Sequence, residues 1–288
     1  MTFNNSVVVI GATGMIGAPV TNRLVDQGWQ VTAIVRDIDK AKVKLNAGIQ
    51  LIKGDLKDPD GLIEAFAGND VVYLSLNTGP FEKDAAFKTE IDGVYNVIEA
   101  AKQTGIKRIG FLSSIIKDYQ GIDWWVFDVK REACRILLDS DLPVTIFYPS
   151  NFFENFPGLQ MMGSRVVLVG EQKTKSWWVG TKDYARQLTA ALQQTHSEDR
   201  EYPVQGHEPM NFDEAAEVFI SHYSYKKLKK TRIPIGMLGI FRKFSVKIDY
   251  NYSIVYAINH YDEQFQSEKT WRDLGNPQQR LAEFTRSL

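Results

Sequence analysis

The chain has 288 residues, of which 44% are hydrophobic and 24% charged, a composition typical of a globular protein. Its formal net charge of −1 creates no overall field that attracts nucleic acid or an anionic membrane, so we expect neither as a partner. Cys134 is the only cysteine, which excludes an internal disulfide. A chain of this length buries about three quarters of its unfolded surface, enough for one large domain or for one domain with an appended lobe.

The same features predict a cytoplasmic protein without a metal cofactor. No apolar run approaches the roughly 20 residues that a membrane helix needs. The first six residues, MTFNNS, lack the basic residue of a secretory signal. Cysteine and histidine residues nowhere show the spacing of metal ligands, and Cys134 is expected to be a buried apolar residue within a helix.

The first distinctive segment is an apolar run followed by three glycines. Val7–Ile10 has the pattern of a strand buried on both faces. In the following GATGMIG, Gly11 allows a tight turn, Gly14 lets the backbone approach a pyrophosphate, and Gly17 lets a helix pack closely on the strand. The N–H groups at the start of that helix lie at its positive dipole end and can bind an anion. The residues predicted to bind a dinucleotide here are Gly11, Thr13, Gly14, Met15, Ile16 and Gly17.

Strands and helices alternate after this segment. Six strands alternating with helices predict an α/β fold, a doubly wound parallel sheet with right-handed crossovers. Asp58 is expected to cap a helix that begins at Pro59. The further strands are predicted at Gln30–Val35, Ile49–Lys53, Val71–Leu76, Arg108–Ser113 and Val144–Tyr148, and the helices at Asp39–Ala47, Pro59–Gly68, Asp84–Thr104 and Trp125–Ser140.

The pattern changes after Pro149. We expect residues 1–150 to form the dinucleotide-binding domain, and residues 151–288 a smaller mixed α/β lobe on the carboxyl edge of the sheet. The basic residues between 226 and 232 are expected to be a solvated edge rather than a nucleic-acid site. Elements of the lobe are predicted at Arg165–Gly170, Ser176–Val179, Thr181–Gln194, Asn211–Tyr223 (with a capping box), Tyr250–Tyr261 and Pro277–Arg286.

The residue that ends the second strand, Arg36, distinguishes between two dinucleotides. An acidic residue at this position bonds the ribose 2′-hydroxyl of NAD, whereas an arginine pairs with the 2′-phosphate of NADP. Arg36, with Lys40 one turn away, favours NADP; NAD stays possible because Asp37 can serve the ribose instead. A charge-assisted arginine–phosphate bond contributes about 1.5–3 kcal/mol, a roughly ten- to hundredfold preference.

Together these motifs resemble an atypical short-chain dehydrogenase/reductase of the NmrA-like family. The likeness covers nearly the whole chain and is strongest up to Asn155. It is carried by GATGMIG, Arg36, Gly54–Leu56, Val71–Leu76, Phe111–Ser114, Tyr148–Asn155 and Asn211–Ala216.

The resemblance implies a Rossmann fold that binds NADP and assigns further residues to the cofactor. Asp55 and Leu56 would border the adenine, although Asp55 is equally expected to bond its own backbone in a turn. Leu74, Ser75 and Leu76 would lie beside the cofactor's ribose and pyrophosphate, and Tyr148, Asn151 and Phe152 beside the nicotinamide.

The catalytic residues depart from the family pattern of Ser and Tyr-x-x-x-Lys. Ser114 ends the fifth strand, and Lys130 lies in the expected helix, where it would hold the nicotinamide ribose. Four residues before Lys130 stands Val126, which cannot exchange a proton. Tyr119, in the preceding loop, is an alternative acid without support from its spacing.

Chemistry without a fixed acid favours an acceptor that forms a stable anion. We therefore predict an NADP-dependent oxidoreductase with a flat small-molecule acceptor such as a quinone, because solvent can protonate the reduced product. A non-catalytic NADP(H) sensor with a protein partner is the alternative, and a sugar-nucleotide epimerase ranks last because it also needs the tyrosine. Aromatic residues that could stack on the acceptor, or simply form the lobe's core, are Trp124, Trp125, Phe152, Phe153, Phe156, Trp177 and Trp178.

Overall fold

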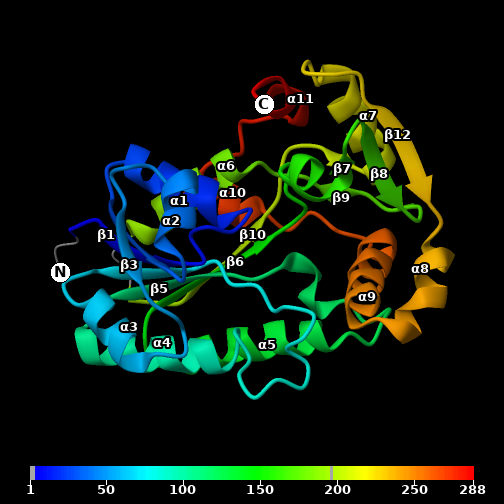
Figure 1. The fold of residues 1–288 in the computed structure, drawn as a ribbon. Coiled ribbons are helices and arrows are strands. Elements are labelled where there is room, and N and C mark those ends of the chain that lie inside the picture. The colour runs from blue at the N-terminus through cyan, green and yellow to red at the C-terminus, as the bar shows by residue number, and fades with distance from the viewer. Residues whose placement is uncertain (1–3, 195–196) are drawn as a thin grey trace.

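A computed structural model describes residues 4–194 and 197–288 and has a seven-stranded parallel sheet at its centre (Figure 1). The prediction that no secretory signal is present rests partly on residues 1–3, which lie outside this range. The strands, in sheet order, are β10 (Arg200–Val204), β6 (Val144–Pro149), β5 (Arg108–Leu112), β4 (Val71–Leu74), β1 (Ser6–Ile10), β2 (Gln30–Val35) and β3 (Gln50–Lys53).

The order of the strands reverses at β1, which pairs with β2 on one side and with β4 on the other. In a doubly wound sheet the crevice beyond the carboxyl ends at such a reversal is where ligands bind. The predicted parallel sheet is confirmed, but a seventh strand, β10, was missed. Its sequence, REYPV, has charged residues and a proline instead of a continuous apolar run, as is typical of an edge strand.

Helices cover both faces of the sheet (Figure 1). Because side chains alternate along a strand, Val7 and Val9 pack on one face and Val8 and Ile10 on the other. The first face carries α1 (Gly17–Asp26), α2 (Ile38–Lys44), α6 (Thr181–Leu192) and α10 (Glu268–Leu274), and the second carries α3 (Pro59–Phe66), α4 (Asp92–Thr104) and α5 (Trp125–Leu138).

Two helices begin later than predicted because carboxylates hold the preceding backbone in loops. Before α4, the Glu82 carboxylate accepts hydrogen bonds from the N–H groups of Gly79 and Thr89, each at 2.7 Å, so the chain is a loop from 79 to 91. Asp183 similarly accepts the N–H groups of residues 278 and 279, and α11 (Leu281–Arg286) starts after them. Helix α10, a helix at Ile235–Phe241 and short strands at Met161–Met162, Pro209–Met210 and Lys229–Ile233 were not predicted, and the other boundaries shift by a few residues.

The rest of the chain forms a smaller mixed lobe beyond the carboxyl edge of the sheet (Figure 1). Its core contains the stacked rings of Phe156, Trp178 and Phe219. Its elements are η1 (Ile115–Asp118) at the end of β5, η2 (Phe156–Gln160), β7 (Met161–Met162), β8 (Arg165–Val169), β9 (Ser176–Trp177), β11 (Pro209–Met210), α7 (Phe212–His222), β12 (Lys229–Ile233), α8 (Ile235–Phe241), η3 (Arg242–Phe244) and α9 (Val246–His260).

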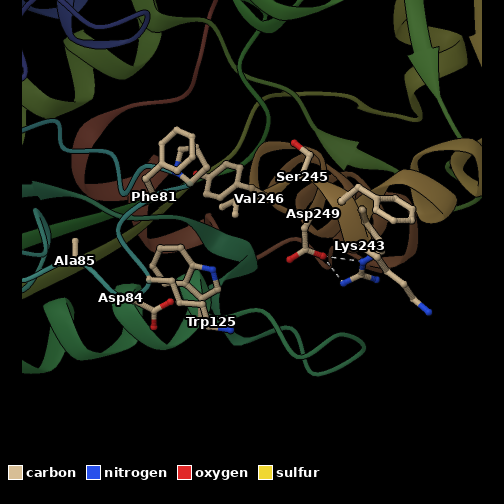
Figure 2. Close-up of a pocket in the computed structure, with 13 residues that line it drawn as sticks. Phe81, Asp84, Ala85, Trp125, Lys243, Ser245, Val246 and Asp249 are labelled. Carbon is tan, nitrogen blue, oxygen red and sulfur yellow. Dashed lines mark hydrogen bonds and ion pairs between the residues drawn. The ribbon is translucent and has the colours of Figure 1, made fainter.

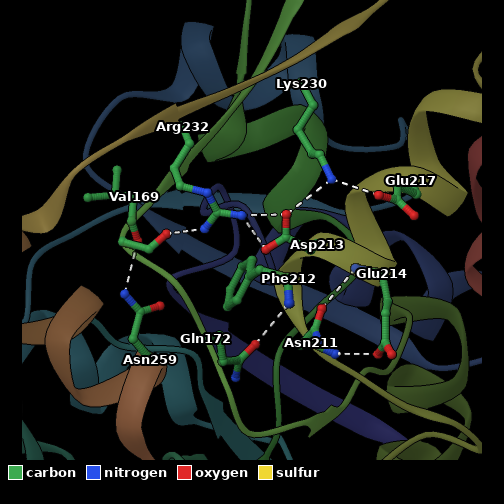
Figure 3. Close-up of polar contacts among 11 residues, drawn as sticks. Val169, Gln172, Asn211, Phe212, Asp213, Glu214, Glu217, Lys230, Arg232 and Asn259 are labelled. Atoms are coloured by element: carbon green, nitrogen blue, oxygen red, sulfur yellow. Dashed lines mark hydrogen bonds and ion pairs between the residues drawn. The ribbon is translucent and has the colours of Figure 1, made fainter.

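Ion pairs hold β12 against α7 (Figure 3). Arg232 and Lys230 both pair with Asp213, and Lys230 also reaches Glu217 at 2.7 Å. The capping box at the start of α7 is confirmed, since Asn211 and Glu214 exchange side chain–backbone hydrogen bonds of 2.9 Å. Two of the basic residues between 226 and 232, Lys230 and Arg232, thus form ion pairs within the lobe.

The central sheet and the helices that pack on it include residues from both sides of the predicted domain boundary at residue 150. Strand β10 pairs with β6 along its whole length, and α6 packs on α1. Within the described part of the chain, we find no helix with the length and apolar character to cross a bilayer.

Candidate functional site

The glycine loop lies tightly against the end of β4. Gly11 has a φ of +85°, and a Cβ there would lie 2.1 Å from the carbonyl oxygen of Ser75. A Cβ on Gly17 would lie 2.1 Å from the carbonyl oxygen of Gly11. Any larger residue at either position would therefore force strand and helix apart.

This loop fits a phosphate group. The N–H groups of Met15 and Ile16 have no hydrogen-bond acceptor among the described residues, and they directly precede the first residue of α1. Unpaired N–H groups at a helix N-terminus are the donors that bind an anion. The Met15 side chain is 40% exposed and lies over Gly158, where an added Cβ would come within 2.6 Å of its sulfur.

At the end of β2, the structure separates the roles of two neighbouring residues. The Asp37 carboxylate caps α2, accepting the Lys40 N–H at 3.1 Å and pairing with the Lys40 ammonium at 3.0 Å. These hydrogen bonds lower the pKa of Asp37. Arg36 is exposed and has no ion-pair partner among the described residues. The guanidinium is thus available for a phosphate, whereas the carboxylate is already engaged.

A second cation, which the sequence reasoning missed, reaches the glycine loop. Lys44 lies one turn beyond Lys40 on α2, and its ammonium donates to the carbonyl oxygen of Thr13 at 2.9 Å. Helical spacing from Lys40 was the available signal.

The residues assigned to the adenine and ribose are engaged in the fold itself. Asp55 accepts the N–H of Lys57 at 3.0 Å, which is the turn interaction considered as its alternative role. Leu56 is 8% exposed and packs on α4, and the Leu74 side chain is fully buried in the core. Ser75 donates its N–H to Ile10 and presents its carbonyl to Gly11, while Leu76 is half-buried.

The residues assigned to the nicotinamide do not all face the same space. The Tyr148 hydroxyl donates to Glu201, and burial raises its pKa. Phe152 packs edge-on against Tyr184 in the core. In contrast, Ser114 and Asn151 both line an 80 Å³ cavity at the carboxyl ends of β5 and β6.

A buried carboxyl group also lines this small cavity. Glu263 is 6% exposed and accepts hydrogen bonds from Ser150 and Gln205, each at 2.7 Å. Burial raises its pKa, although the hydrogen bonds act in the opposite direction. Glu263 precedes no recognisable motif, so nothing in the sequence pointed to it.

Lys130 belongs to a chain of polar contacts that ties α5 to the loop after β4. Its ammonium lies 3.1 Å from both carboxylate oxygens of Glu90, which is fully buried. Thr78 donates its N–H and its hydroxyl to the same carboxylate at 2.9 and 3.0 Å. The Tyr250 hydroxyl donates to the Thr78 carbonyl at 2.8 Å. Burial raises the pKa of Tyr250 to about 12, and the negative charge of Glu90 adds to this shift.

An apolar residue occupies the place of the family's tyrosine. Val126 is 1% exposed and packs with Ile116, Phe127 and Ala257. The ring of Tyr119 packs edge-on against that of Tyr261, at 6.0 Å between centroids. Neither residue gives Lys130 a proton-donating neighbour.

A larger cavity of about 570 Å³ lies between the loop after β4, the start of α5, and η3 with α9 (Figure 2). Phe81, Trp125 and Val246 border it in Figure 2, and the rest of its apolar lining comes from Pro80, Ala85, Phe244 and Tyr250. Its polar lining comes from Lys83, Asp84, Arg242, Lys243, Ser245 and Asp249.

Of the aromatic residues proposed to stack on an acceptor, only Trp125 lines this larger cavity. The others pack in the protein core or against neighbouring rings; they are Trp124, Phe152, Phe153, Phe156, Trp177 and Trp178. Phe81 and Phe244 were missed because a loop and a short 3₁₀ turn give no periodic signal.

Curated relatives of this chain include a reductase and an assembly factor. The chain is 27% identical over 253 residues to "Photosystem II assembly factor Ycf39" of Cyanophora paradoxa, and the aligned region covers 86% of this chain and 78% of that protein. It is 28% identical to "NAD(P)H azoreductase" of Xenophilus azovorans, over 73% of this chain and 71% of that protein.

Solved structures of reductases share the fold. Citrobacter sp. triphenylmethane reductase, complexed with NADP(H), aligns with a TM-score of 0.73 and 22% identity over 98% of this chain and 99% of that one. Escherichia coli NADPH-dependent quinone oxidoreductase QOR2, complexed with NADPH, aligns with a TM-score of 0.70 and 22% identity over 97% and 98% of the two chains. These neighbours confirm the predicted Rossmann fold and agree with the predicted cofactor class.

The family profile settles the classification. The NmrA-like family matches residues 4–280, which is nearly the whole chain and includes every motif on which the resemblance rested. The protein is therefore a member of the NmrA-like family.

Proposed function

We propose that this chain is an NADP-dependent oxidoreductase that reduces a flat, self-stabilised acceptor such as a quinone. The observation that carries the proposal is the aromatic-lined 570 Å³ cavity beside the Lys130–Glu90–Thr78–Tyr250 contacts, combined with valine at position 126. When bound, the dinucleotide supplies a hydride. Relatives and neighbours named as azoreductase, triphenylmethane reductase and quinone oxidoreductase support this class of reaction.

The chain's own residues would bind and orient the two reactants. The N–H groups at residues 15 and 16 bind the pyrophosphate, and Arg36 pairs with the 2′-phosphate. Lys130, held in place by Glu90, donates to the nicotinamide ribose. Ser114, at the end of β5, borders the smaller cavity near the reacting end.

The proton supply determines which acceptors suit this site. A reduced carbonyl is a strong base and needs a well-placed acid with a pKa near neutral. Tyr250 already donates to the Thr78 carbonyl and has a pKa raised to about 12, so it is a poor acid at pH 7. A reduced quinone is a weak base that water protonates. The site therefore favours quinones and dyes over aldehydes.

The test is NADPH oxidation by the purified protein with quinones, azo dyes and aldehydes. Phe81 is 64% exposed and lines the cavity, so Phe81→Ala should raise the KM for quinones severalfold without unfolding the protein. Tyr95→Ala is the matched control, because Tyr95 is 48% exposed on α4 and does not line the cavity. Turnover of aldehydes but not quinones would contradict the proposal.

A non-catalytic role as an NADP(H) sensor is the second candidate. The observation in its favour is that the Lys130 ammonium is already neutralised by Glu90. A relative whose name, an assembly factor, describes no reaction also supports this candidate. Tight NADPH binding without turnover of any acceptor, together with NADPH-dependent protection of residues after Pro149 from proteolysis, would favour this candidate.

A further inference from the structure

Exposed apolar side chains occur on α8, on η3, at the start of α9 and on the loop after β4. We call the exposed side chains of Phe81, Met237, Ile240, Phe241, Phe244 and Val246 the apolar patch. None of the seven residues of α8 is buried, and Ile240 and Phe244 are 67% and 84% exposed. Figure 1 shows α8 at the outer edge of the molecule, away from the central sheet. A helix with sequence IGMLGIF that contributes nothing to a core is unusual for an isolated globular protein.

Lysines with free charges surround this patch. Lys83, Lys243 and Lys247 are exposed and have no carboxylate partner among the described residues. Lys247 lies over the ring of Phe81, 5.6 Å from its centroid. Arg242, by contrast, is neutralised by Asp249 at 2.7 Å, which Figure 2 shows. Two nearby carboxylates, those of Glu82 and Asp84, also have no ion-pair partner among the described residues, so the three lysines leave the surroundings of the patch positive by one charge.

The patch continues into the larger cavity. Phe81, Phe244 and Val246 belong to both, so one side of the cavity lining is also part of the exposed apolar surface. Figure 2 shows Phe81, Val246 and Lys243 among the residues that line the cavity. A molecule that leaves the cavity past these side chains would meet the patch before it meets bulk water.

We propose that the apolar patch docks on an anionic lipid bilayer, and that the acceptor is a lipid-soluble quinone that enters the cavity from the membrane. Apolar side chains flanked by lysines are the features that hold a short helix in the headgroup region. A symmetric dimer through the patch is disfavoured, because it would bring two sets of unpaired lysines together. The net charge of −1 describes the whole chain and does not oppose binding by a locally positive surface. Docking on a bilayer surface also needs no spanning helix, and none is found among the described residues.

The test is co-sedimentation of the full chain with vesicles. We expect binding to vesicles of equal parts phosphatidylglycerol and phosphatidylcholine, and little binding to pure phosphatidylcholine. Ile240→Ser with Phe241→Ser should abolish binding, since both side chains are more than half exposed and neither lines the cavity. Lys243→Gln should weaken it about fivefold. Val43→Ser is the matched control, because Val43 is 87% exposed on α2, far from α8 in Figure 1.

Kinetics separate this inference from the proposed function on which the choice of acceptor rests. The double variant should raise the KM for a long-chain quinone embedded in vesicles at least tenfold and leave turnover of a water-soluble quinone unchanged. Vesicle binding without any quinone turnover would overturn the proposed function but not the docking. No binding to anionic vesicles, or a dimer in solution that the double variant converts to a monomer, would overturn the docking.

Discussion

Arg36 and Asp37 are adjacent in the sequence but have opposite surroundings, and this contrast is the basis of the predicted preference for NADP. The carboxylate is bound twice by Lys40, whereas the guanidinium is exposed and has no ion-pair partner among the described residues. Arg36→Ala should therefore weaken NADPH binding roughly ten- to hundredfold, the equivalent of a lost charge-assisted bond to phosphate, and leave NADH binding nearly unchanged. Fluorescence titration of both nucleotides measures the difference.

Lys42→Ala is the matched control, because this side chain is on α2, the helix that follows Arg36, is 65% exposed and pairs with Asp39. It should alter NADPH affinity far less than Arg36→Ala. An equal loss of NADH and NADPH affinity in Arg36→Ala would contradict the role of the 2′-phosphate.

Glu263, which lines the smaller cavity, predicts a pH dependence of stability. Burial raises the pKa of the folded carboxyl above its ordinary value of 4.5, so the folded protein binds this proton more tightly than the unfolded chain. The stabilisation is fully present below pH 4.5 and is lost as the pH rises through the folded pKa. As the pH rises from 4.5 through the folded pKa, the free energy of unfolding of the wild type should fall relative to that of Glu263→Gln. Urea denaturation of both proteins across this pH range measures the difference.

Glu214 provides a control of opposite sign. The hydrogen bond from the Asn211 N–H lowers the pKa of Glu214, so its contribution is present above pH 4.5 and is lost as the pH falls through its folded pKa. Relative to Glu214→Gln, the wild type should lose stability on acidification. If both comparisons changed in the same direction, the assignment for Glu263 would fail.

At the scale of elements, the Lys130–Glu90 pair joins α5 to the loop that precedes α4. Glu90 is fully buried and the Lys130 side chain is 16% exposed, so removing the ammonium leaves a carboxylate without its partner away from water. Lys130→Met should destabilise the fold by about 3–5 kcal/mol, as breaking one side of a buried pair does. Thermal unfolding measures this loss.

The double variant Lys130→Met with Glu90→Gln distinguishes structure from catalysis. It removes both charges together, so most of the stability should return. NADPH oxidation should not return if Lys130 holds the nicotinamide ribose. Recovery of activity along with stability would show that Lys130 acts only through the fold.

Elements with strong local signals were predicted from the sequence, and those set by distant contacts were not. Buried strands such as Val71–Leu74 and the helix capped by Asp58 follow from local patterns and agree with the structure. The late start of α4 depends on a side chain, Glu82, that bonds the backbone seven residues away. Strand β10 is polar and pairs only because β6 leaves an open edge.

The site shows the same division. The conformation of the glycine loop and the place of Arg36 at the end of β2 were predictable because both follow from backbone geometry at fixed places in the fold, while their roles toward the cofactor stay predictions. The larger cavity was not, because it joins Phe81, Trp125 and Tyr250 from three segments that are far apart in the sequence. Nothing local in Phe81 or Phe244 indicates that they share a cavity, and only the packing of α9 beside α5 brings them together.

At the scale of the whole molecule, the sheet depends on residues that follow the predicted boundary at 150. Tyr184, Leu188 and Leu192 of α6 are fully buried on the face that also contains Val7 and Val9. The Tyr184 hydroxyl also bonds that of Tyr73 within this core, at 2.8 Å. Burying three such side chains contributes roughly 5–9 kcal/mol, which is comparable to the net stability of a whole domain, about 5–15 kcal/mol.

A fragment of residues 1–150 should therefore fail to fold, although it contains the glycine loop, Arg36 and Lys130 of the predicted dinucleotide site. It would leave one face of the sheet open to water and the edge of β6 unpaired, so we expect no cooperative thermal transition, no NADPH binding, and aggregation through that edge. Calorimetry and NADPH titration of the fragment beside the full chain test this expectation. A fragment that unfolds cooperatively and binds NADPH as tightly as the full chain would instead establish residues 1–150 as an independent domain. If the fragment fails to fold, the central sheet and the C-terminal lobe belong to one folding unit. Substitutions in α6 would then weaken cofactor binding without contacting the cofactor.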